Sequence, residues 1–321
     1  MDAILPKYDD WHGLSRQSQL EVVRTKDIRV RSAVHDGVEK LRERLAELSE
    51  KGKGEWVRSL PERKKTELEH GDHWRDPVVI GDSSPEALEK TRGNIKWYAT
   101  VRTSREYRKN WIAEHAKGKI FLDYACGIGE QTIEAAKAGS ALAIGIDLST
   151  VSLERARNDA GAAGVETRSF FLQADCENTG LPDNSVDTIL CSGMLHHLDL
   201  TSAFPEMKRI LKPGGKCLAI EALKYNPIIQ VYRALTPAYR TKWEAAHIIG
   251  LKEISLAREF FNVTDVKYWH FFSLFATPFR RTPIFDTLLC IANWLDRCFL
   301  RVFPFSLLAW QVTFEMSKRE D

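Results

Sequence analysis

The sequence predicts an α/β fold in which helices cover both faces of a doubly wound, mainly parallel sheet. Short apolar runs alternate with helical segments between residues 118 and 222. The runs are KIFLDYA, ALAIGID, RSFFLQAD, VDTILCSG and KCLAIEA. Each run is almost continuously hydrophobic, as expected of strands that are buried on both faces. The segments between them carry apolar residues at helical spacing and end in Gly or Pro-Gly.

The chain divides into a charge-rich region, residues 1–92, and a main domain, residues 93–321. We interpret the first region as a helical N-terminal extension. Its apolar residues Val38, Leu41, Leu45 and Leu48 fall on one helical face. That face packs either on the main domain or against a second subunit, which would make the protein a homo-oligomer.

Two further strands, VTDVKYWHFFSL and AWQVTFEM, are predicted after the first five. The segment at about residues 224–250 is rich in aromatic residues and arginine, and we expect it to cover a ligand site. The segment at about residues 276–308 is apolar and interrupted by Asp and Arg, which is typical of an amphipathic helical lid or an interface. Contact of this C-terminal lid with a membrane surface therefore stays open.

Composition excludes several classes of protein. The 46 basic and 44 acidic residues nearly balance, so a nucleic acid is not an expected partner. The cysteines form no C-x-x-C pair. The first residues, MDAILPKYDDWH, lack the pattern of a secretory signal, so we expect a cytoplasmic location. No apolar run reaches the roughly 18 residues that a membrane span needs.

The most specific motif is LDYACGIG, in which Asp123 closes the first strand and Gly127 and Gly129 form the turn into a helix. Glycines there let a ligand approach the backbone at a helix N-terminus. A dinucleotide site would have a third glycine where Thr132 stands. An amino acid suits this site better than a pyrophosphate does, because its amino group can bind the acidic strand end and its carboxyl group can bind the backbone amides.

Two more carboxylates follow neighbouring strands. Asp147 ends the second strand, at the position where an acidic residue receives ribose hydroxyls, and Asp175 ends the third strand. The carboxyl ends of parallel strands meet at one edge of the sheet. The sequence therefore predicts one elongated pocket that contains Asp123, Asp147 and Asp175.

The order LDYACGIG, GID, QAD, CSGMLHHL and LKPGG resembles the class I S-adenosylmethionine-dependent methyltransferases of the small-molecule type. The resemblance implies a Rossmann-like sheet with an antiparallel last strand and S-adenosylmethionine as the cofactor. By this resemblance Asp123, Gly127 and Gly129 surround the methionine part. The ribose and adenine neighbours would be Asp147, Leu148, Asp175 and Cys176. The segment NIKWYATVRTSREY resembles a helix that closes over the cofactor, which makes Tyr98 and Arg102 further candidates.

Methyl transfer to a hydroxyl, an amine or an acidic carbon can require a base. The fourth strand ends in CSGMLHHL, which supplies His196 and His197, and we expect His197 to be the base. The residues expected to shape the acceptor site are Glu221, Tyr225, Tyr239 and Arg240. His70 and His73 have helical spacing but lack a third ligand, so no metal is predicted.

The sequence therefore predicts methyl transfer to a small-molecule acceptor whose reacting atom is oxygen, carbon, nitrogen or sulfur. One alternative is a catalytically inactive S-adenosylmethionine-binding scaffold or partner protein. A nicotinamide-dependent oxidoreductase is less consistent with the missing third glycine and with Asp123.

Overall fold

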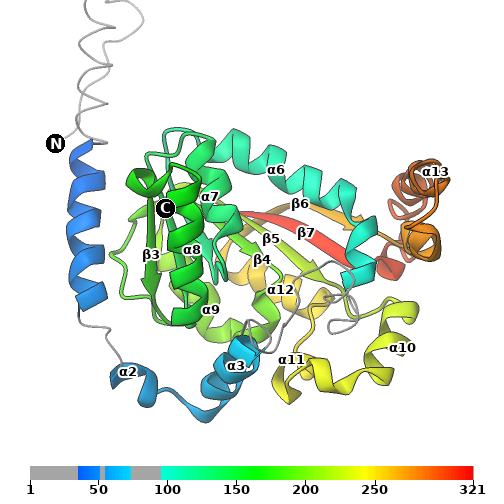
Figure 1. The fold of residues 1–321 in the computed structure, drawn as a ribbon, viewed down its shortest axis with the longest axis horizontal. Coiled ribbons are helices and arrows are strands. Elements are labelled where there is room, and N and C mark those ends of the chain that lie inside the picture. The colour runs from blue at the N-terminus through cyan, green and yellow to red at the C-terminus, as the bar shows by residue number, and fades with distance from the viewer. Residues whose placement is uncertain (1–34, 51–54, 74–94, 321) are drawn as a thin grey trace, which may run out of the picture. The chain divides into compact units, whose positions relative to one another are not determined.

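The computed structural model describes residues 35–50, 55–73 and 95–320 (Figure 1). Residues 1–44 and 45–321 form two compact units. The described part of the first unit belongs to a helix that covers residues 35–50, in agreement with the predicted helical N-terminal region.

The second unit contains a seven-stranded sheet with the strand order β3-β2-β1-β4-β5-β7-β6. Its strands are β1 (Ile120–Tyr124), β2 (Leu142–Asp147), β3 (Ser169–Gln173), β4 (Val186–Ser192), β5 (Leu211–Ala222), β6 (Asn262–Trp269) and β7 (Gln311–Ser317). The first five strands are parallel, and β7 runs antiparallel to both β5 and β6. This topology confirms the predicted doubly wound sheet with an antiparallel last strand.

The α-helices of the second unit connect and cover these strands. They are α2 (Glu55–Arg58), α3 (Glu62–His73), α6 (Arg102–Ala116), α7 (Glu130–Lys137), α8 (Thr150–Ala162), α9 (Leu200–Ile210), α10 (Pro227–Leu235), α11 (Lys242–Ala246), α12 (Leu251–Phe260) and α13 (Phe285–Phe299). The 3₁₀ turns are η2 (Ile95–Thr100), η3 (Glu166–Arg168), η4 (Leu195–His197), η5 (Pro237–Tyr239), η6 (Phe272–Phe279) and η7 (Phe305–Leu308). Figure 1 shows α6, α7 and α8 on one side of the sheet and α9 and α12 on the other.

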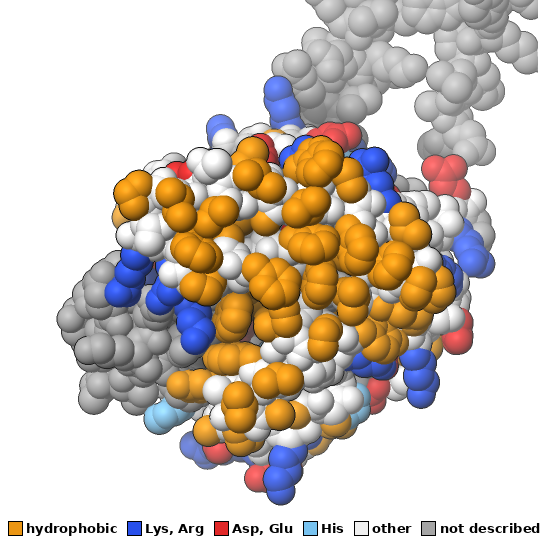
Figure 2. All heavy atoms as spheres, turned by 90° about the vertical axis from the view of Figure 1, so that its right-hand side faces the viewer, with side chains coloured by type: hydrophobic (Ala, Val, Ile, Leu, Met, Phe, Trp, Pro, Cys, Tyr) orange, Lys and Arg blue, Asp and Glu red, His pale blue; other side chains and the backbone are white. Residues whose placement is uncertain are grey.

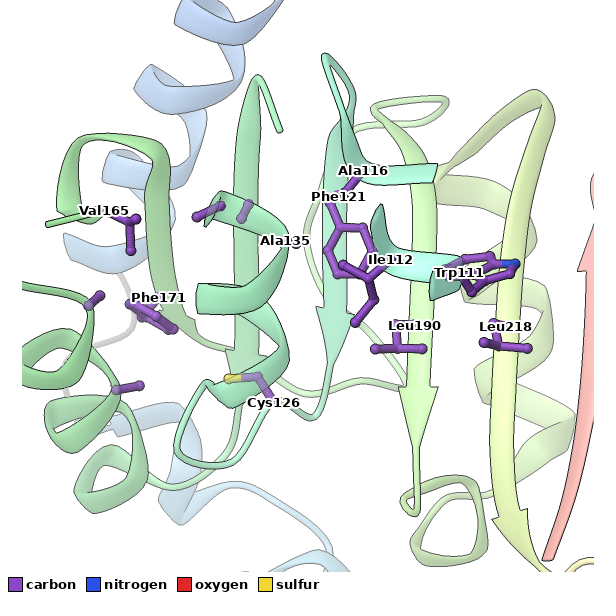
Figure 3. Packing of buried hydrophobic residues seen from close by; sticks show 14 of the residues in the cluster. Trp111, Ile112, Ala116, Phe121, Cys126, Ala135, Val165, Phe171, Leu190 and Leu218 are labelled. Atoms are coloured by element: carbon purple, nitrogen blue, oxygen red, sulfur yellow. The ribbon is translucent and has the colours of Figure 1, made fainter. Parts of the chain in front are cut away.

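The core on the first side joins α6, α7 and α8 to the sheet (Figure 3). Trp111 and Ile112 of α6 pack beside Phe121 of β1, and Leu190 and Leu218 extend the cluster over β4 and β5. All the residues of β1 and β2 are buried, which explains why these runs are continuously hydrophobic in the sequence.

The sixth strand ends earlier than the sequence predicts. It stops at Trp269, and the next residue, His270, has left-handed backbone with a φ of 68°. The following turn η6 is held by the buried carboxylate of Asp296 on α13, which accepts the backbone N–H groups of Phe271, Phe272 and Ser273. This contact joins η6 to α13.

The turn between β1 and α7 depends on Gly129. Its φ is 76°, and a Cβ atom there would lie 2.7 Å from Cε1 of Phe171 and 2.8 Å from Cβ of Ala156. Any side chain would therefore strain the backbone and displace α8 and β3.

We expect Gly129→Ala to lower the free energy of unfolding by about 2 kcal/mol or more, because left-handed backbone and overpacking each cost on the order of 1–2 kcal/mol. Gly161→Ala is the matched control, since a Cβ there meets nothing within 4 Å. In the exposed end of α8 that change should leave stability equal or raise it by roughly 0.5–1 kcal/mol. Urea unfolding followed by circular dichroism measures both, and equal stability of the two variants would contradict this account.

Candidate functional site

A cavity of about 1120 Å³ lies at the carboxyl ends of the parallel strands. The predicted cofactor-binding residues that line it are Asp123, Gly127, Asp147, Leu148, Asp175 and Cys176. The three carboxylates therefore share one cavity. Gly129 does not line it, because it is buried between Phe171 and Ala156 and forms the N-terminus of α7.

Asp123 is buried at the floor of this first cavity. Its Oδ2 atom accepts hydrogen bonds from the backbone N–H (3.0 Å) and the hydroxyl group (2.8 Å) of Thr132. Burial raises the pKa of the Asp123 carboxyl to about 7, although both bonds from Thr132 lower it. A cation beside this carboxyl would favour its ionised form, so the position suits an ammonium group.

Asp147 is the last residue of β2 and holds the loop that follows β1. Its Oδ2 atom accepts the backbone N–H of Gly127 at 2.8 Å, and its Oδ1 atom accepts that of Ser149 at 2.9 Å. A carboxylate oxygen has two lone pairs, so each oxygen can also accept a hydroxyl donor. Asp147 can therefore bind a diol without giving up its backbone contacts.

Asp175 lies two residues beyond the end of β3, in the loop that leaves the sheet. Its Oδ2 atom is 2.5 Å from Nζ of Lys64, and its Oδ1 atom accepts the N–H of Glu177 at 2.9 Å. The backbone carbonyl of the next residue, Cys176, accepts the hydroxyl group of Tyr124. This edge of the cavity is therefore fixed by internal contacts on both residues.

Helix α3 contributes a set of cavity residues that the sequence does not reveal. Besides its bond to Asp175, Lys64 lies 2.7 Å from Glu177, which also binds Arg63 at 2.6 Å. One turn further along α3, Glu67 lies on the same face of the helix and binds Nδ1 of His197 at 2.6 Å. The pattern ERKKTELEHGDH is typical of a solvated helix, yet in the structure it forms one wall of the cavity.

The loop after β4 is held by Glu221, at the carboxyl end of β5. One oxygen of this buried carboxylate accepts the backbone N–H groups of Met194 (2.8 Å) and Leu195 (2.7 Å). The other oxygen is 2.7 Å from Nδ1 of His196. Glu221 was expected to shape the acceptor site, and its hydrogen bonds show that it orients the histidine loop.

The two histidines have different surroundings, although their rings are 4.3 Å apart. His196 lines a second cavity, of about 390 Å³, and His197 lines both cavities. Burial lowers the pKa of His196, but the adjacent Glu221 carboxylate outweighs this effect and the pKa is raised above its ordinary value. Ser192 and Gly193 also line both cavities, so the cavities meet at this loop.

The second cavity carries more positive than negative charge. Its basic lining residues are Arg105, Arg108, Arg233 and Arg240, and its acidic ones are Glu221 and Glu244. Burial and the neighbouring Arg240 lower the pKa of Arg233 to about 10. Two buried side-chain nitrogens of this cavity have no hydrogen-bond partner among the described residues. They are Nε1 of Trp97 and Nε of Arg108. These features favour a ligand with an anionic or oxygen-rich group.

The other predicted residues are dispersed. Tyr98 lines the second cavity rather than the first, and Arg102 forms an ion pair with Asp286 at 2.6 Å outside both. Arg240 lines the second cavity, whereas Tyr225 and Tyr239 line neither. The hydroxyl group of Tyr225 instead accepts the backbone N–H of Leu251.

The two expected lid segments also differ in position. Residues 224–250 supply six side chains to the second cavity: Ile229, Tyr232, Arg233, Arg240, Glu244 and Ile248. Residues 276–308 supply none to either of these two cavities.

Residues 122–219 match the family model described as a methyltransferase domain. The matched residues run from β1 to β5 and contain the three carboxylates and the histidine loop. These residues are therefore similar to a methyltransferase domain, which agrees with the motifs that resemble the class I S-adenosylmethionine-dependent methyltransferases. The cofactor of this domain family is S-adenosylmethionine.

Curated relatives are similar over this methyltransferase domain. The 27-O-demethylrifamycin SV methyltransferase of Amycolatopsis mediterranei (strain S699) is 36% identical over 31% of this chain and 37% of its own. Methyltransferase GfsG of Streptomyces halstedii is 28% identical over 55% of this chain and 58% of its own. The chain thus spans between about a third and three fifths of the length of these relatives.

The fold of the methyltransferase domain is also found in solved structures. Geranyl diphosphate C-methyltransferase from Streptomyces coelicolor A3(2), in complex with Mg²⁺, geranyl diphosphate and S-adenosyl-L-homocysteine, superposes with a TM-score of 0.51. The two chains are 14% identical, and the superposition covers 76% of this chain and 88% of the other. At this identity the comparison establishes a shared fold.

Lys64→Ala should destabilise the protein by about 3 kcal/mol, because removing one partner of a buried ion pair leaves the other charge uncompensated. Lys64 is the buried cation between Asp175 and Glu177. Its neighbour Lys65 is half-buried on the same helix, and Lys65→Ala, as the matched control, should change stability by less than about 0.5 kcal/mol. Urea unfolding compares the two variants. The same midpoint for both would show that α3 is not anchored through Lys64.

Proposed function

We propose that this chain is an enzyme that transfers the methyl group of S-adenosylmethionine to a small-molecule acceptor. The observation that supports this most directly is the meeting of two cavities at Ser192, Gly193 and His197. A group-transfer enzyme needs two adjoining sites so that the donor and the acceptor are aligned. The first cavity suits the cofactor, and the second suits the acceptor.

The chemistry of the first cavity fits the parts of S-adenosylmethionine. We assign the ribose hydroxyls to Asp147, which keeps lone pairs free beside its backbone contacts. The buried Asp123 carboxyl and the backbone at Gly127 would hold the amino-acid part, and the loop with Asp175 and Cys176 would hold the adenine. Lys64 donates to one oxygen of the Asp175 carboxylate. The adenine amino group would donate to one of the lone pairs that remain on this carboxylate.

Asp147→Ala should weaken the binding of S-adenosylmethionine by at least about tenfold, because each charged hydrogen bond contributes roughly 1.5–3 kcal/mol. Asp183→Ala is the control, since Asp183 is an exposed carboxylate paired with Arg209 outside both cavities. Titration calorimetry measures both affinities, and circular dichroism checks that both variants are folded. Full affinity in Asp147→Ala would refute the assignment of the ribose.

The second cavity suits an acceptor that carries an anionic group beside an apolar part. Its four arginines would bind a carboxylate or a phosphate, and the unpartnered nitrogens of Trp97 and Arg108 would gain an acceptor. Its apolar lining comes from Ile220, Ile229, Ile248 and Trp310. We therefore propose an amphipathic small molecule as the acceptor.

When bound, S-adenosylmethionine supplies a methyl group on a positively charged sulfur, and the sulfur keeps the electron pair of the sulfur–carbon bond that breaks. We propose that His196 accepts the proton that the acceptor atom loses as its new bond to the methyl carbon forms. Glu221 binds Nδ1 of His196 and thereby directs Nε2 to the second cavity. His197, the base expected from the motif, has the same kind of contact, between its Nδ1 atom and Glu67, but it lines the first cavity as well as the second.

The two histidines can be separated by mutation. His196→Ala should lower turnover by about 100-fold or more, with little change in cofactor affinity, because a general base contributes on the order of 100-fold to 10,000-fold. His197→Ala, as the matched comparison, should have the smaller effect on turnover and the larger one on cofactor affinity, since His197 lines the first cavity. A larger loss of turnover in His197→Ala than in His196→Ala would assign the role of base to His197.

The pH profile tests the role of Glu221. The raised pKa keeps His196 protonated to a higher pH than usual, and the protonated ring cannot act as a base. Turnover should therefore rise with pH through a value above the ordinary histidine pKa of about 6.5. Glu221→Gln removes the charge that raises this pKa, so the rise should move to lower pH. An unchanged profile would exclude His196 as the titrating group.

The proposal as a whole is tested with methyl-labelled cofactor and a cell metabolite extract, followed by mass spectrometry of the labelled product. Labelled product made by the protein and lost in His196→Ala supports the proposal. Tight cofactor binding without any product would indicate the inactive scaffold.

A further inference from the structure

The C-terminal segment of residues 271–305 exposes an unusual number of large apolar side chains. We call these side chains the apolar face; they are Phe275, Phe279, Ile284, Ile291, Trp294, Leu295, Val302, Phe303 and Phe305. Figure 2 shows this side of the molecule, with hydrophobic side chains gathered across it and charged side chains of both signs at its margins. Contiguous apolar surface of this kind marks a contact with another molecule or a membrane.

Helix α13 shows why this surface needs a second partner. One side of the helix packs on the protein through Phe285, Leu289 and Ala292, which are buried. The opposite side carries Ile291 and Trp294, which are 53% and 62% exposed. A surface helix normally has one apolar stripe, and α13 has two. The outward stripe therefore has no partner within the described part of the chain.

The charged residues of the segment 271–305 are mostly basic. Residues 271–305 contain four arginines and two aspartates: Arg280, Arg281, Arg297 and Arg301, with Asp286 and Asp296. Neither aspartate offers a free negative charge. Asp286 forms an ion pair with Arg102, and Asp296 is buried on the backbone N–H groups of η6. Arg297 and Arg301 are exposed, so the segment presents exposed aromatic and aliphatic side chains together with the positive charge of these two residues.

We propose that the apolar face docks this protein on the surface of an anionic lipid bilayer. Aromatic and aliphatic side chains combined with arginine are the composition of an interfacial membrane contact, in which the apolar groups enter the boundary layer and the arginines bind headgroups. A second copy of the chain is less suited, because a twofold interface would bring two basic faces together. Among the described residues, no helix is both long enough and apolar enough to cross a bilayer, so the contact is peripheral.

A third cavity borders this face and shares one lining residue, Trp97, with the second cavity. It has a volume of about 360 Å³ and is lined by Trp97, Ile228, Leu274, Phe275 and Pro278, among others. Phe275 belongs to the apolar face, and Trp97 also lines the second cavity. This step rests on the proposed function: docking would place a membrane-soluble acceptor at the third cavity, on the side of the molecule where Trp97 also lines the second cavity.

The test is flotation of the full chain with vesicles of phosphatidylcholine, alone or with about a quarter phosphatidylglycerol. The wild-type protein should partition onto the anionic vesicles at least about tenfold more than onto the neutral ones. The double variant Trp294→Ser/Phe303→Ser should lose at least about tenfold of that binding, because these side chains are 62% and 69% exposed and would enter the bilayer. Leu251→Ser is the matched control, since Leu251 is exposed on α12, and it should bind as the wild type does.

A second readout locates the contact. Of the six cysteines, Cys290 and Cys298 on α13 are exposed and the other four are buried. A polarity-sensitive dye on these two thiols should shift its emission to the blue when anionic vesicles are added. Calorimetric titration with S-adenosylmethionine checks that the variants keep a folded cofactor site, and it also separates a failure of docking from a failure of the proposed function.

Two results would overturn the proposal. One is wild-type protein that binds the cofactor but stays off anionic vesicles. The other is a double variant that floats as well as the wild type. A concentration-dependent dimer that the double variant abolishes, without vesicle binding by the wild type, would assign the face to a second copy of the chain instead.

Discussion

The buried carboxylate of Glu221 is the group on which the arrangement of the two cavities depends. A carboxylate without partners is costly to bury, so its hydrogen bonds to Met194, Leu195 and His196 are obligatory in this fold. They fix the loop after β4 in one conformation. Because Gly193 and His197 of that loop line both cavities, together with Ser192 at the end of β4, the same contact sets where the two cavities meet.

The sheet and the cofactor side of the site could be predicted from the sequence for a physical reason. A parallel strand that is buried on both faces must be hydrophobic throughout, so the runs around Asp123 and Asp147 are visible without a structure. The carboxyl ends of such strands point to one edge, which places their acidic residues in one cavity. The limit of β6 was less visible, because it depends on the backbone of His270 and on a contact with Asp296.

Long-range contacts account for most of what the sequence did not reveal. Lys64 and Asp175 are 111 positions apart, and the local pattern around Lys64 is that of an ordinary solvated helix. The different environments of His196 and His197 depend on Glu221 and Glu67, which are also distant in the chain. Arg102 was expected at the cofactor on the basis of family resemblance, and its ion pair with Asp286 holds it elsewhere. The pairing of subunits through residues 1–92 stays a prediction.

The central claim is that the first cavity holds S-adenosylmethionine with its sulfur at the loop shared by both cavities. A crystal structure of the protein with S-adenosyl-L-homocysteine tests this most directly. We predict ribose hydroxyls on Asp147 and the sulfur atom beside Ser192 to His197, facing the second cavity. A ligand bound outside the first cavity, or one whose sulfur faces away from the second cavity, would contradict the account.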